Sequence, residues 1–380
     1  MPIRKTKLKV TYDGVDITED VSQQITSFSF VERSKHGESD ELNITFENAS
    51  KLWSNGWFPD RGAKLTAKLI VENWFYPGDS FEIDCGQFEI DDISDSGPPS
   101  IFTIGSLSVG ITSSIRGEAN SRAWENMRLS VIIEQLAAKH GFKVFFESDY
   151  NPIFTRFDQK KQSDLSFILK VAEYAGLQVK LSHGKLIVYQ DSLFDQKDVS
   201  LTITDKYDGL ISRNFRASSA DIYTACHVKY LDSKSGNLLT YQFATEGDSG
   251  TLEGTSSTTS TAQKIDQNTR MVIPATSTTK KTENISAPLT GKILKINRRV
   301  ESLAEAEKLA KSMLRNQNRR ELTGSISLMG NPMLRAGMII AVNGFGRFDT
   351  ARWVIEEVSH EWSKSSGLKT NISMRGAMRY

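Results

Sequence analysis

The chain has 380 residues, more than one hydrophobic core usually fills, so we expect roughly two to four domains. Hydrophobic residues make up 38% of it and charged residues 24%, as in ordinary soluble globular proteins. The formal net charge of +1 excludes a bulk electrostatic attraction to nucleic acid or membranes. No apolar run approaches the ~20 residues that cross a bilayer, and the basic N-terminus lacks the apolar stretch of a secretory signal. We therefore expect a protein folded in a cytoplasm.

Residues 1–117 have the pattern of several short strands, because apolar and polar residues alternate in one run after another. Turn residues separate the runs, beginning with the hairpin signal Asp13-Gly14 and ending with Gly97-Pro98-Pro99. Almost no helical pattern lies between them. We therefore predict an antiparallel barrel or sandwich, with strands around residues 8–12, 28–30, 42–46, 65–71, 88–90 and 102–104.

Residues 118–197 differ in character, because apolar residues recur at helical spacing in two places. The first predicted helix begins near Leu129 and ends before Gly141, and the second follows the N-cap residue Ser163 and ends before Gly176. Each glycine suits the position just past a helix, where a positive φ is favoured, and a strand pattern follows each. We predict a small α+β domain in which a helix–glycine–strand unit occurs twice.

Residues 198–380 return to strand patterns, which a Ser/Thr/Gly-rich stretch at 246–289 interrupts. This stretch has too little apolar content to offset an ordering entropy of about 1–2 kcal/mol per residue, so it is either a flexible loop or an arm ordered by a neighbouring chain. We infer an assembly arm. Ser302 and Glu305 then form a capping box before a helical stripe. We expect the strands of 199–245 and 290–376 to close into a second barrel.

The sequence offers few candidates for catalysis. No phosphate-loop, dinucleotide or nucleophile-elbow motif is present. The acidic pairs Asp91-Asp92 and Glu356-Glu357 occur in strand patterns, where neighbouring side chains point to opposite faces, so we do not expect them to act as a glycosidase pair. None of the five histidines has the spacing of a metal site; they are His36, His140, His183, His227 and His360. We predict no catalytic residue, no metal and no cofactor.

Two other groups of residues have structural explanations. Cys85 and Cys226 lie far apart and outside any C-x-x-C motif, so we expect reduced thiols in the core. Arg315, Arg319 and Arg320 are expected on the polar side of the helix that starts near Ser302. Contact with a partner chain or with passing DNA is the alternative for these arginines.

Taken in order, the motifs resemble those of the phage late control protein D family, the tail hub proteins of contractile-tailed phages. The D-G-x-D-I-T turn of that family matches residues 13–18, and its G-P-P turn matches Gly97-Pro98-Pro99. Its two helices match those that end at Gly141 and Gly176. Its G-x-P-x-L-x-x-G turn and its V-x-x-V-x-H strand, here with one extra residue between the valines, correspond to Gly330, Pro332, Leu334, Gly337, Val354, Val358 and His360.

This resemblance implies a mainly β protein with an α+β insert: two tube-like antiparallel β-barrels at 1–117 and 198–380, and a helical α+β domain at 118–197. It implies a non-enzymatic, cofactor-free homotrimer that joins the sixfold tail tube to the threefold spike in a virion tail or tail-like baseplate, assembled in the host bacterial cytoplasm. The implied partners are the spike or tip protein and the tube protein, with the tape measure and baseplate wedge proteins as further candidates, and DNA only as passing cargo. The hub domain of type VI secretion spike proteins is similar. The resemblance does not distinguish between a phage tail, a tailocin and another injection system. The alternative function is that of a hub-associated protein that binds or hydrolyses cell wall.

Overall fold

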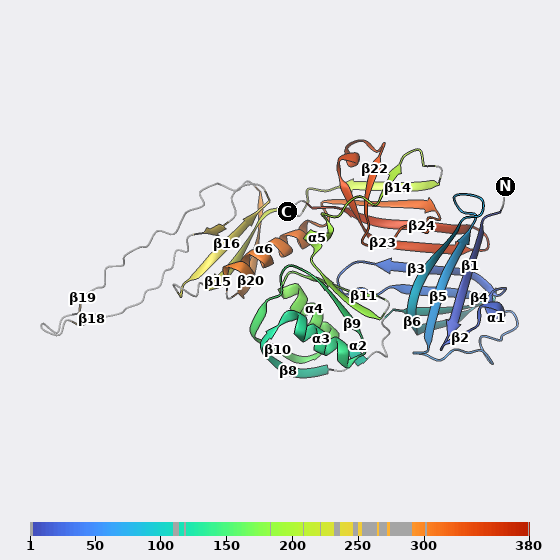
Figure 1. The fold of residues 1–380 in the computed structure, drawn as a ribbon, viewed down its shortest axis with the longest axis horizontal. Helices are drawn as coiled ribbons and strands as arrows, with labels where there is room; N and C mark the ends of the chain where they lie inside the picture. Colours follow the sequence, from blue (N-terminus) through green and yellow to red (C-terminus); the bar gives the residue numbers. More distant parts are fainter. Residues whose placement is uncertain are drawn as a thin grey trace. The chain divides into compact units, whose positions relative to one another are not determined.

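The computed structural model describes residues 3–108, 114–117, 119–182, 184–207, 209–220, 222–231, 236–245, 250–252, 264–265, 272–273, 291–300, 302–378 and 380. The chain divides into two compact units (Figure 1): Met1–Ser218 with Arg319–Arg379, and Ser219–Asn318 with Tyr380. Most of the predicted arm at 246–289 lies outside the described residues, as does His183.

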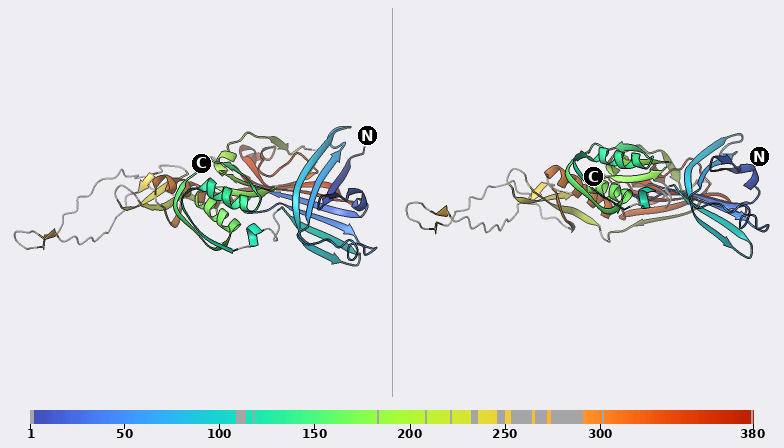
Figure 2. Two further views of the ribbon diagram at one scale, coloured as in Figure 1. Left: turned by 60° about the horizontal axis from the view of Figure 1, so that its bottom comes forward. Right: turned by 90° about the horizontal axis from the view of Figure 1, so that it is seen from below.

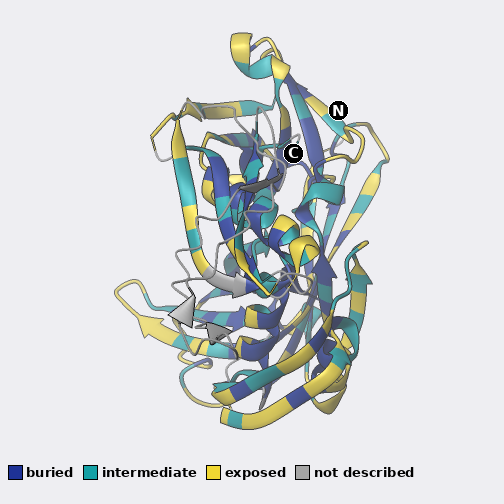
Figure 3. Cartoon of the chain, turned by 90° about the vertical axis from the view of Figure 1, so that its left-hand side faces the viewer, coloured by how far each residue is buried: buried dark blue, intermediate teal, exposed yellow. Residues whose placement is uncertain are grey.

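The N-terminal part of the first unit is one antiparallel sheet in the order β3-β4-β7-β6-β5-β1-β2. Its elements are β1 Lys5–Tyr12, β2 Val15–Asp16, α1 Thr18–Val21, β3 Ile25–Arg33, β4 Glu41–Glu47, β5 Lys64–Glu72, β6 Ser80–Ser96 and β7 Ile101–Leu107. The alternating pattern buries one face, as at Leu42, Ile44 and Phe46 of β4, and the bands along single strands in Figure 3 show this alternation.

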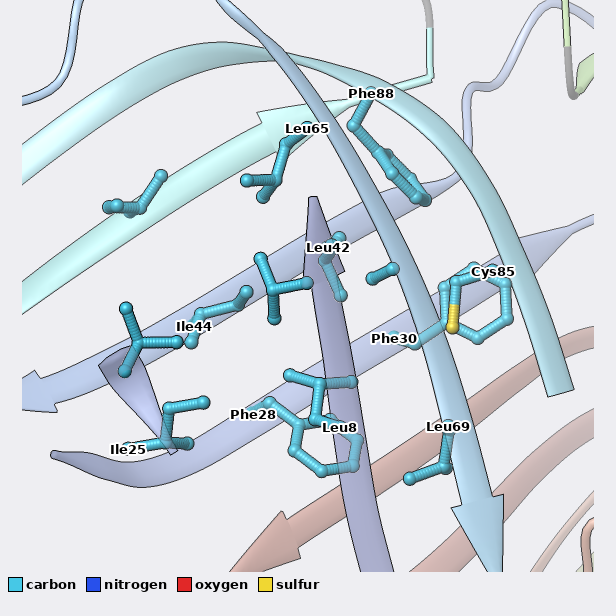
Figure 4. Packing of buried hydrophobic residues seen from close by; sticks show 14 of the residues in the cluster. Leu8, Ile25, Phe28, Phe30, Leu42, Ile44, Leu65, Leu69, Cys85 and Phe88 are labelled. Atoms are coloured by element: carbon cyan, nitrogen blue, oxygen red, sulfur yellow. The ribbon is translucent and has the colours of Figure 1, made fainter. Parts of the chain in front are cut away.

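This sheet curls around its own core. Figure 2 shows the blue strands bending over, so that β1 and β5 lie across the core from β3 and β4. In Figure 4 the side chains of Leu8, Phe28, Leu42, Leu65 and Phe88 point toward one another from five different strands. The result is a barrel-like half with an apolar interior; its closure into a complete tube stays a prediction.

The next segment is the predicted α+β insert. Its elements are α2 Ser114–Gly117, β8 Ala119–Arg128, α3 Leu129–Lys139, β9 Lys143–Glu147, β10 Ile153–Ser163, α4 Asp164–Tyr174, β11 Gln178–Ser182, β12 Lys185–Tyr189 and α5 Asp191–Phe194. Helices α3 and α4 pack between the two-stranded antiparallel sheet β10-β8 and the sheet β11-β12-β9, around a core of their own (Figure 1). Ser163 caps α4 by accepting a hydrogen bond from the backbone N–H of Ser166 at 3.2 Å.

The C-terminal part of the first unit continues the same large sheet. Its elements are β13 Leu201–Thr204, β14 Leu210–Ala217, β21 Leu322–Met329, β22 Ile339–Asn343, the 3₁₀ helix η1 Gly346–Thr350, β23 Arg352–Ser363 and β24 Gly367–Gly376. The order is β14-β21-β24-β23, and β23 pairs antiparallel with β3, so the sheet passes without a break from one half to the other. The predicted mainly β class with an α+β insert is thereby confirmed. The domain boundaries at 117 and 197 stay a proposal.

The second unit contains strands that we expected in the second barrel. It consists of β15 Tyr223–Leu231, β16 Leu238–Ala244, β17 Gly250–Leu252, β18 Lys264–Ile265, β19 Val272–Ile273, β20 Lys292–Val300 and α6 Leu303–Asn318. In the described structure β17-β16-β15-β20 form a separate sheet against which α6 packs. An alternating pattern fixes which face of a strand is buried but not which strand is its neighbour, and the expected grouping differs for that reason.

Candidate functional site

The predicted motif residues of the N-terminal half lie in turns between strands. Asp13 and Gly14, with φ of 44° and 85°, connect β1 to β2, and Asp13 Oδ1 accepts a hydrogen bond from the backbone N–H of Lys64 at 2.8 Å. The segment Gly97-Pro98-Pro99 connects β6 to β7. These residues shape the ends of hairpins, and any direct role in assembly stays a prediction.

The two glycines of the α+β insert end their helices as the sequence predicts. Gly141 follows α3 with φ of 76°, and Gly176 follows α4 with φ of 75°. The next residue donates back to the helix in both cases: Phe142 N–H to the carbonyl of Ala137 at 3.0 Å, and Leu177 N–H to that of Ala172 at 2.8 Å. Both are Schellman ends, which satisfy carbonyls that the helix leaves free.

Gly330 joins the two halves of the large sheet at a tight contact. Its carbonyl accepts a hydrogen bond from Trp74 Nε1 of the β5–β6 loop, and its N–H donates to the carbonyl of Leu368 at 2.8 Å. A Cβ at this position would lie 2.5 Å from Leu368 Cγ and 2.8 Å from Trp74 Cζ2. Pro332 is buried in the turn that follows. Glycine is therefore required by close packing between segments far apart in sequence.

Replacing Gly330 by valine is expected to lower the free energy of unfolding by about 1–3 kcal/mol, because the new side chain overpacks Trp74 and Leu368. Gly117→Ala is the matched control, since an added Cβ there meets nothing within 4 Å. Urea denaturation followed by tryptophan fluorescence checks both variants. Equal stability of G330V and the parent protein would show that this contact relaxes at no cost.

The other C-terminal motif residues position the strand β23 and its surroundings. Gly337, with φ of 89°, donates its N–H to the carbonyl of Ile355 at 2.8 Å. His360 of β23 is fully buried, with Nδ1 3.1 Å from Thr370 Oγ1 and its ring stacked on Phe30 of β3. Burial, together with the charge of Arg335, lowers the pKa of His360 to about 3. The histidine is therefore a neutral core residue at the β3–β23 junction.

A buried group of charges, the Arg375 cluster, holds α5 against the large sheet; its members are Arg375, Asp195, Asp191, Glu356 and Arg319. Arg375 donates two hydrogen bonds to the carboxylate of Asp195, at 2.8 and 3.0 Å, and its Nε lies 3.4 Å from Glu356 Oε1. Arg319 pairs with Asp191 and, at 3.3 Å, with Glu356. Burial alone would lower the pKa of Arg375. The hydrogen bonds to Asp195 and the charges of the neighbouring carboxylates outweigh this effect, so the pKa of Arg375 lies above its ordinary value.

A second group, the Asp40 cluster, attaches β11 of the insert to the N-terminal half. Lys180 lies 3.2 Å from Glu32 and 3.9 Å from Asp40, and Ser182 Oγ donates to Asp40 Oδ2 at 2.6 Å. Asp40 also accepts the backbone N–H of Arg33 at 2.9 Å. Burial raises the pKa of Asp40, and Lys180 and Ser182 oppose that shift.

A cavity of about 310 Å³ lies between the two clusters and is lined by Glu32, Lys180, Tyr189, Asp191, Glu356 and Arg375, among others. Tyr189 closes one side, where its hydroxyl donates to the carbonyl of Ser34 at 2.6 Å. Apart from Lys185, the charged groups that line the cavity pair with one another, so their evident task is to position the insert on the sheet. They show no nucleophile placed beside a base.

The remaining candidate groups for chemistry have structural roles. Across the described ranges, no group of three or more histidine, cysteine or acidic side chains is placed to hold a metal ion. Cys85 and Cys226 are buried thiols whose pKa burial raises to about 12. Glu357 pairs with Arg33 at 3.0 Å, as Glu356 does with the Arg375 cluster. None of the helices that the structure describes is long and apolar enough to cross a membrane.

Most members of the two clusters were not predicted from the sequence, and two arginines lie elsewhere than expected. Arg315 is buried in α6, where it donates to the carbonyl of Tyr380, and Arg319 lies just beyond the end of α6 in the first unit. Neither is a solvated residue on the polar side of the helix. Lys180 lies in β11, a strand buried on both faces, where a lysine needs a partner; the sequence there alternates apolar and polar residues and so carries no signal of that burial.

Comparisons with known proteins agree with this fold. The sequence model of the family described as Phage tail baseplate hub (GPD) matches residues 115–366. The "Probable baseplate hub protein" of Escherichia phage P2 is 27% identical over 231 residues, which cover 58% of this chain and 55% of that protein, so the match spans about half of the relative's length.

Solved structures support the fold alone, because their identities are low. The tail protein from Neisseria meningitidis MC58 has a TM-score of 0.62 at 12% identity, with 97% of this chain and 96% of that chain covered. An E. coli protein described as a component of the type VI secretion system, similar to T4 tail proteins gp27 and gp5, has a TM-score of 0.52 at 10% identity, covering 99% and 78%. Since the family model covers well over half of the chain, the protein belongs to the phage tail baseplate hub (GPD) family, as its resemblance to late control protein D predicts.

Proposed function

We propose that this chain is the structural hub of a contractile tail or tail-like particle, a trimer that adapts a sixfold tail tube to a threefold spike. The observation that carries the proposal is the continuous sheet, in which β3 and β23 join two mainly antiparallel halves within one chain; the parallel pair β13–β22 is the exception. Three chains with two such halves each would present six β-units to the tube and three equivalent chains to the spike. Assembly by burial of complementary surface requires no catalytic group.

Membership of the baseplate hub family supports the place of the protein in a phage tail. We propose the tube and spike proteins as its direct partners, with tape measure and wedge proteins as further neighbours and DNA as cargo in a phage. The insert, fixed by the Asp40 and Arg375 clusters, is proposed to lie at the periphery of the trimer. In this proposal the hub is assembled in the bacterial cytoplasm.

The mass of the purified protein in solution tests this proposal. Light scattering coupled to gel filtration is expected to give three times the mass of a 42.5 kDa chain, or a complex with three copies of each protein once the spike protein is added. An unrelated β-rich tail protein of similar size serves as the control for nonspecific association. A chain that stays monomeric with both the spike and tube proteins present would refute the trimeric adaptor.

A further inference from the structure

One end of the N-terminal barrel-like half carries an apolar hollow of about 470 Å³. Its walls come from the curled sheet and from the loop between β4 and β5, and include Val10, Ile44, Phe46, Trp53 and Leu65. Figure 4 shows Ile44 and Leu65 on the inner side of the curl. The hollow therefore leads into the core of this half and is large enough to accept apolar side chains of another molecule.

Aromatic side chains stand exposed at the mouth of this hollow. Trp57 is 41% exposed and Phe58 is 56% exposed, and both line the hollow. Trp57 contacts the edge of Trp53 at a centroid distance of 5.6 Å, and Trp53 stacks on Phe46 at 4.0 Å. Phe58 similarly contacts Phe102 at 6.0 Å. The exposed rings thus pack against buried rings of the core, an arrangement typical of the anchoring residues of interfaces.

The backbone of this loop is also fixed, so the surface exists before a partner arrives. The N–H of Trp53 donates to Asn48 Oδ1 at 3.2 Å, and Trp53 Nε1 donates to Gln24 Oε1 at 2.6 Å. The N–H of Asp60 donates to the hydroxyl of Tyr12 at 3.0 Å. A preformed aromatic surface loses little side-chain entropy on binding.

The rim of the hollow is acidic. Segments 13–20 and 56–61 carry five carboxylates and a single cation, Arg61. Asp20 lines the hollow itself, and Glu19 is exposed beside it. Among the ion pairs of the described residues, none involves Asp16, Glu19, Asp20 or Asp60. Charge complementarity therefore favours a partner that brings basic residues.

We propose that this surface, the Trp57 surface (Trp57, Phe58, Asp20 and the hollow), docks a segment of another tail protein in which an apolar side chain is flanked by lysine or arginine. The apolar side chain enters the hollow between the aromatic rings, and the flanking cations lie against the acidic rim. The proposal rests on the proposed hub function only in taking the partner from the tail, and it does not depend on trimer formation.

Two labelled peptides test the recognition chemistry directly on the full chain. One has a leucine–phenylalanine–leucine centre flanked by lysines, and the other has the same centre flanked by glutamates. At low salt the lysine peptide is expected to bind at least about tenfold more tightly by fluorescence anisotropy, and binding should weaken by a similar factor in W57A/F58S and in E19K/D20K. Met333→Ala, which removes an exposed apolar side chain elsewhere, is the matched control and should bind as the parent does.

A photo-crosslinker placed at position 57 in assembled tails then identifies the natural occupant. A crosslinked segment that combines an apolar residue with flanking basic residues supports the proposal. A crosslink to an acidic or uncharged segment, or to a second copy of this chain, overturns it, as does equal or absent binding of the two peptides. Because the light-scattering experiment is separate, failure of the trimer and failure of this surface give different results.

Discussion

Replacing Arg375 by methionine is expected to lower the free energy of unfolding of the first unit by about 3–5 kcal/mol. The arginine is 2% exposed and holds Asp195 through two hydrogen bonds, so its removal leaves a fully buried carboxylate without its cation. Asp191 and Glu356 would lose the same positive charge. Urea or guanidinium denaturation of the full chain, followed by circular dichroism, measures the loss.

Arg352→Met is the matched control for this variant, because Arg352 lies on β23 but is exposed. Its replacement is expected to change stability by less than about 0.5 kcal/mol. A double-mutant cycle with Asp195→Asn isolates the coupling between the two charges. If R375M and R352M showed the same small loss in the free energy of unfolding, the cluster would not anchor α5 to the sheet.

The stability of the first unit is expected to rise with pH between about 3 and 6.5, with a contribution of up to about 1.4 kcal/mol per pH unit from His360. The folded protein keeps the imidazole neutral down to about pH 3, whereas the unfolded chain binds a proton below 6.5. Over this window the unfolded state binds more protons, so acidification favours unfolding. Denaturation midpoints at pH 4.5, 5.5 and 6.5 measure the slope.

Two variants separate titration of His360 from loss of packing. His360→Gln removes the titrating group and should flatten the pH dependence, whatever it does to absolute stability. Thr370→Val removes the hydrogen-bond partner at 3.1 Å but leaves the buried imidazole, so the slope should persist. A slope that H360Q leaves unchanged would assign the acid sensitivity to other groups.

Patterns local in sequence predicted the elements well. Glycines at 141 and 176 end their helices at positive φ, and the N–H of Glu305 binds the Ser302 side chain at 3.2 Å, which is half of the predicted capping box. Strands with one buried face, such as β4 and β5, were found from their alternation. In contrast, β8 and β10 were missed because both are largely exposed and show no clear alternation.

Contacts between distant segments could not be predicted in the same way. Nothing local distinguishes Arg375 from an ordinary polar residue on a strand, because its partner Asp195 precedes it by about 180 residues. The requirement for glycine at 330 depends on Trp74, which belongs to another hairpin. The assignment of β15, β16 and β20 to a unit of their own depends on which strand edges meet, and alternation carries no information about that.

The pairing of β3 with β23 has a consequence for synthesis on the ribosome. Residues 27–33 of β3 bond to residues 357–363 of β23, which are translated about 330 residues later. At roughly 5–20 residues per second, the outer edge of β3 stays unpaired for tens of seconds after the first half has been made. An open strand edge is a template for association with other chains. The nascent chain is therefore prone to aggregate until β23 has been synthesised and pairs with β3.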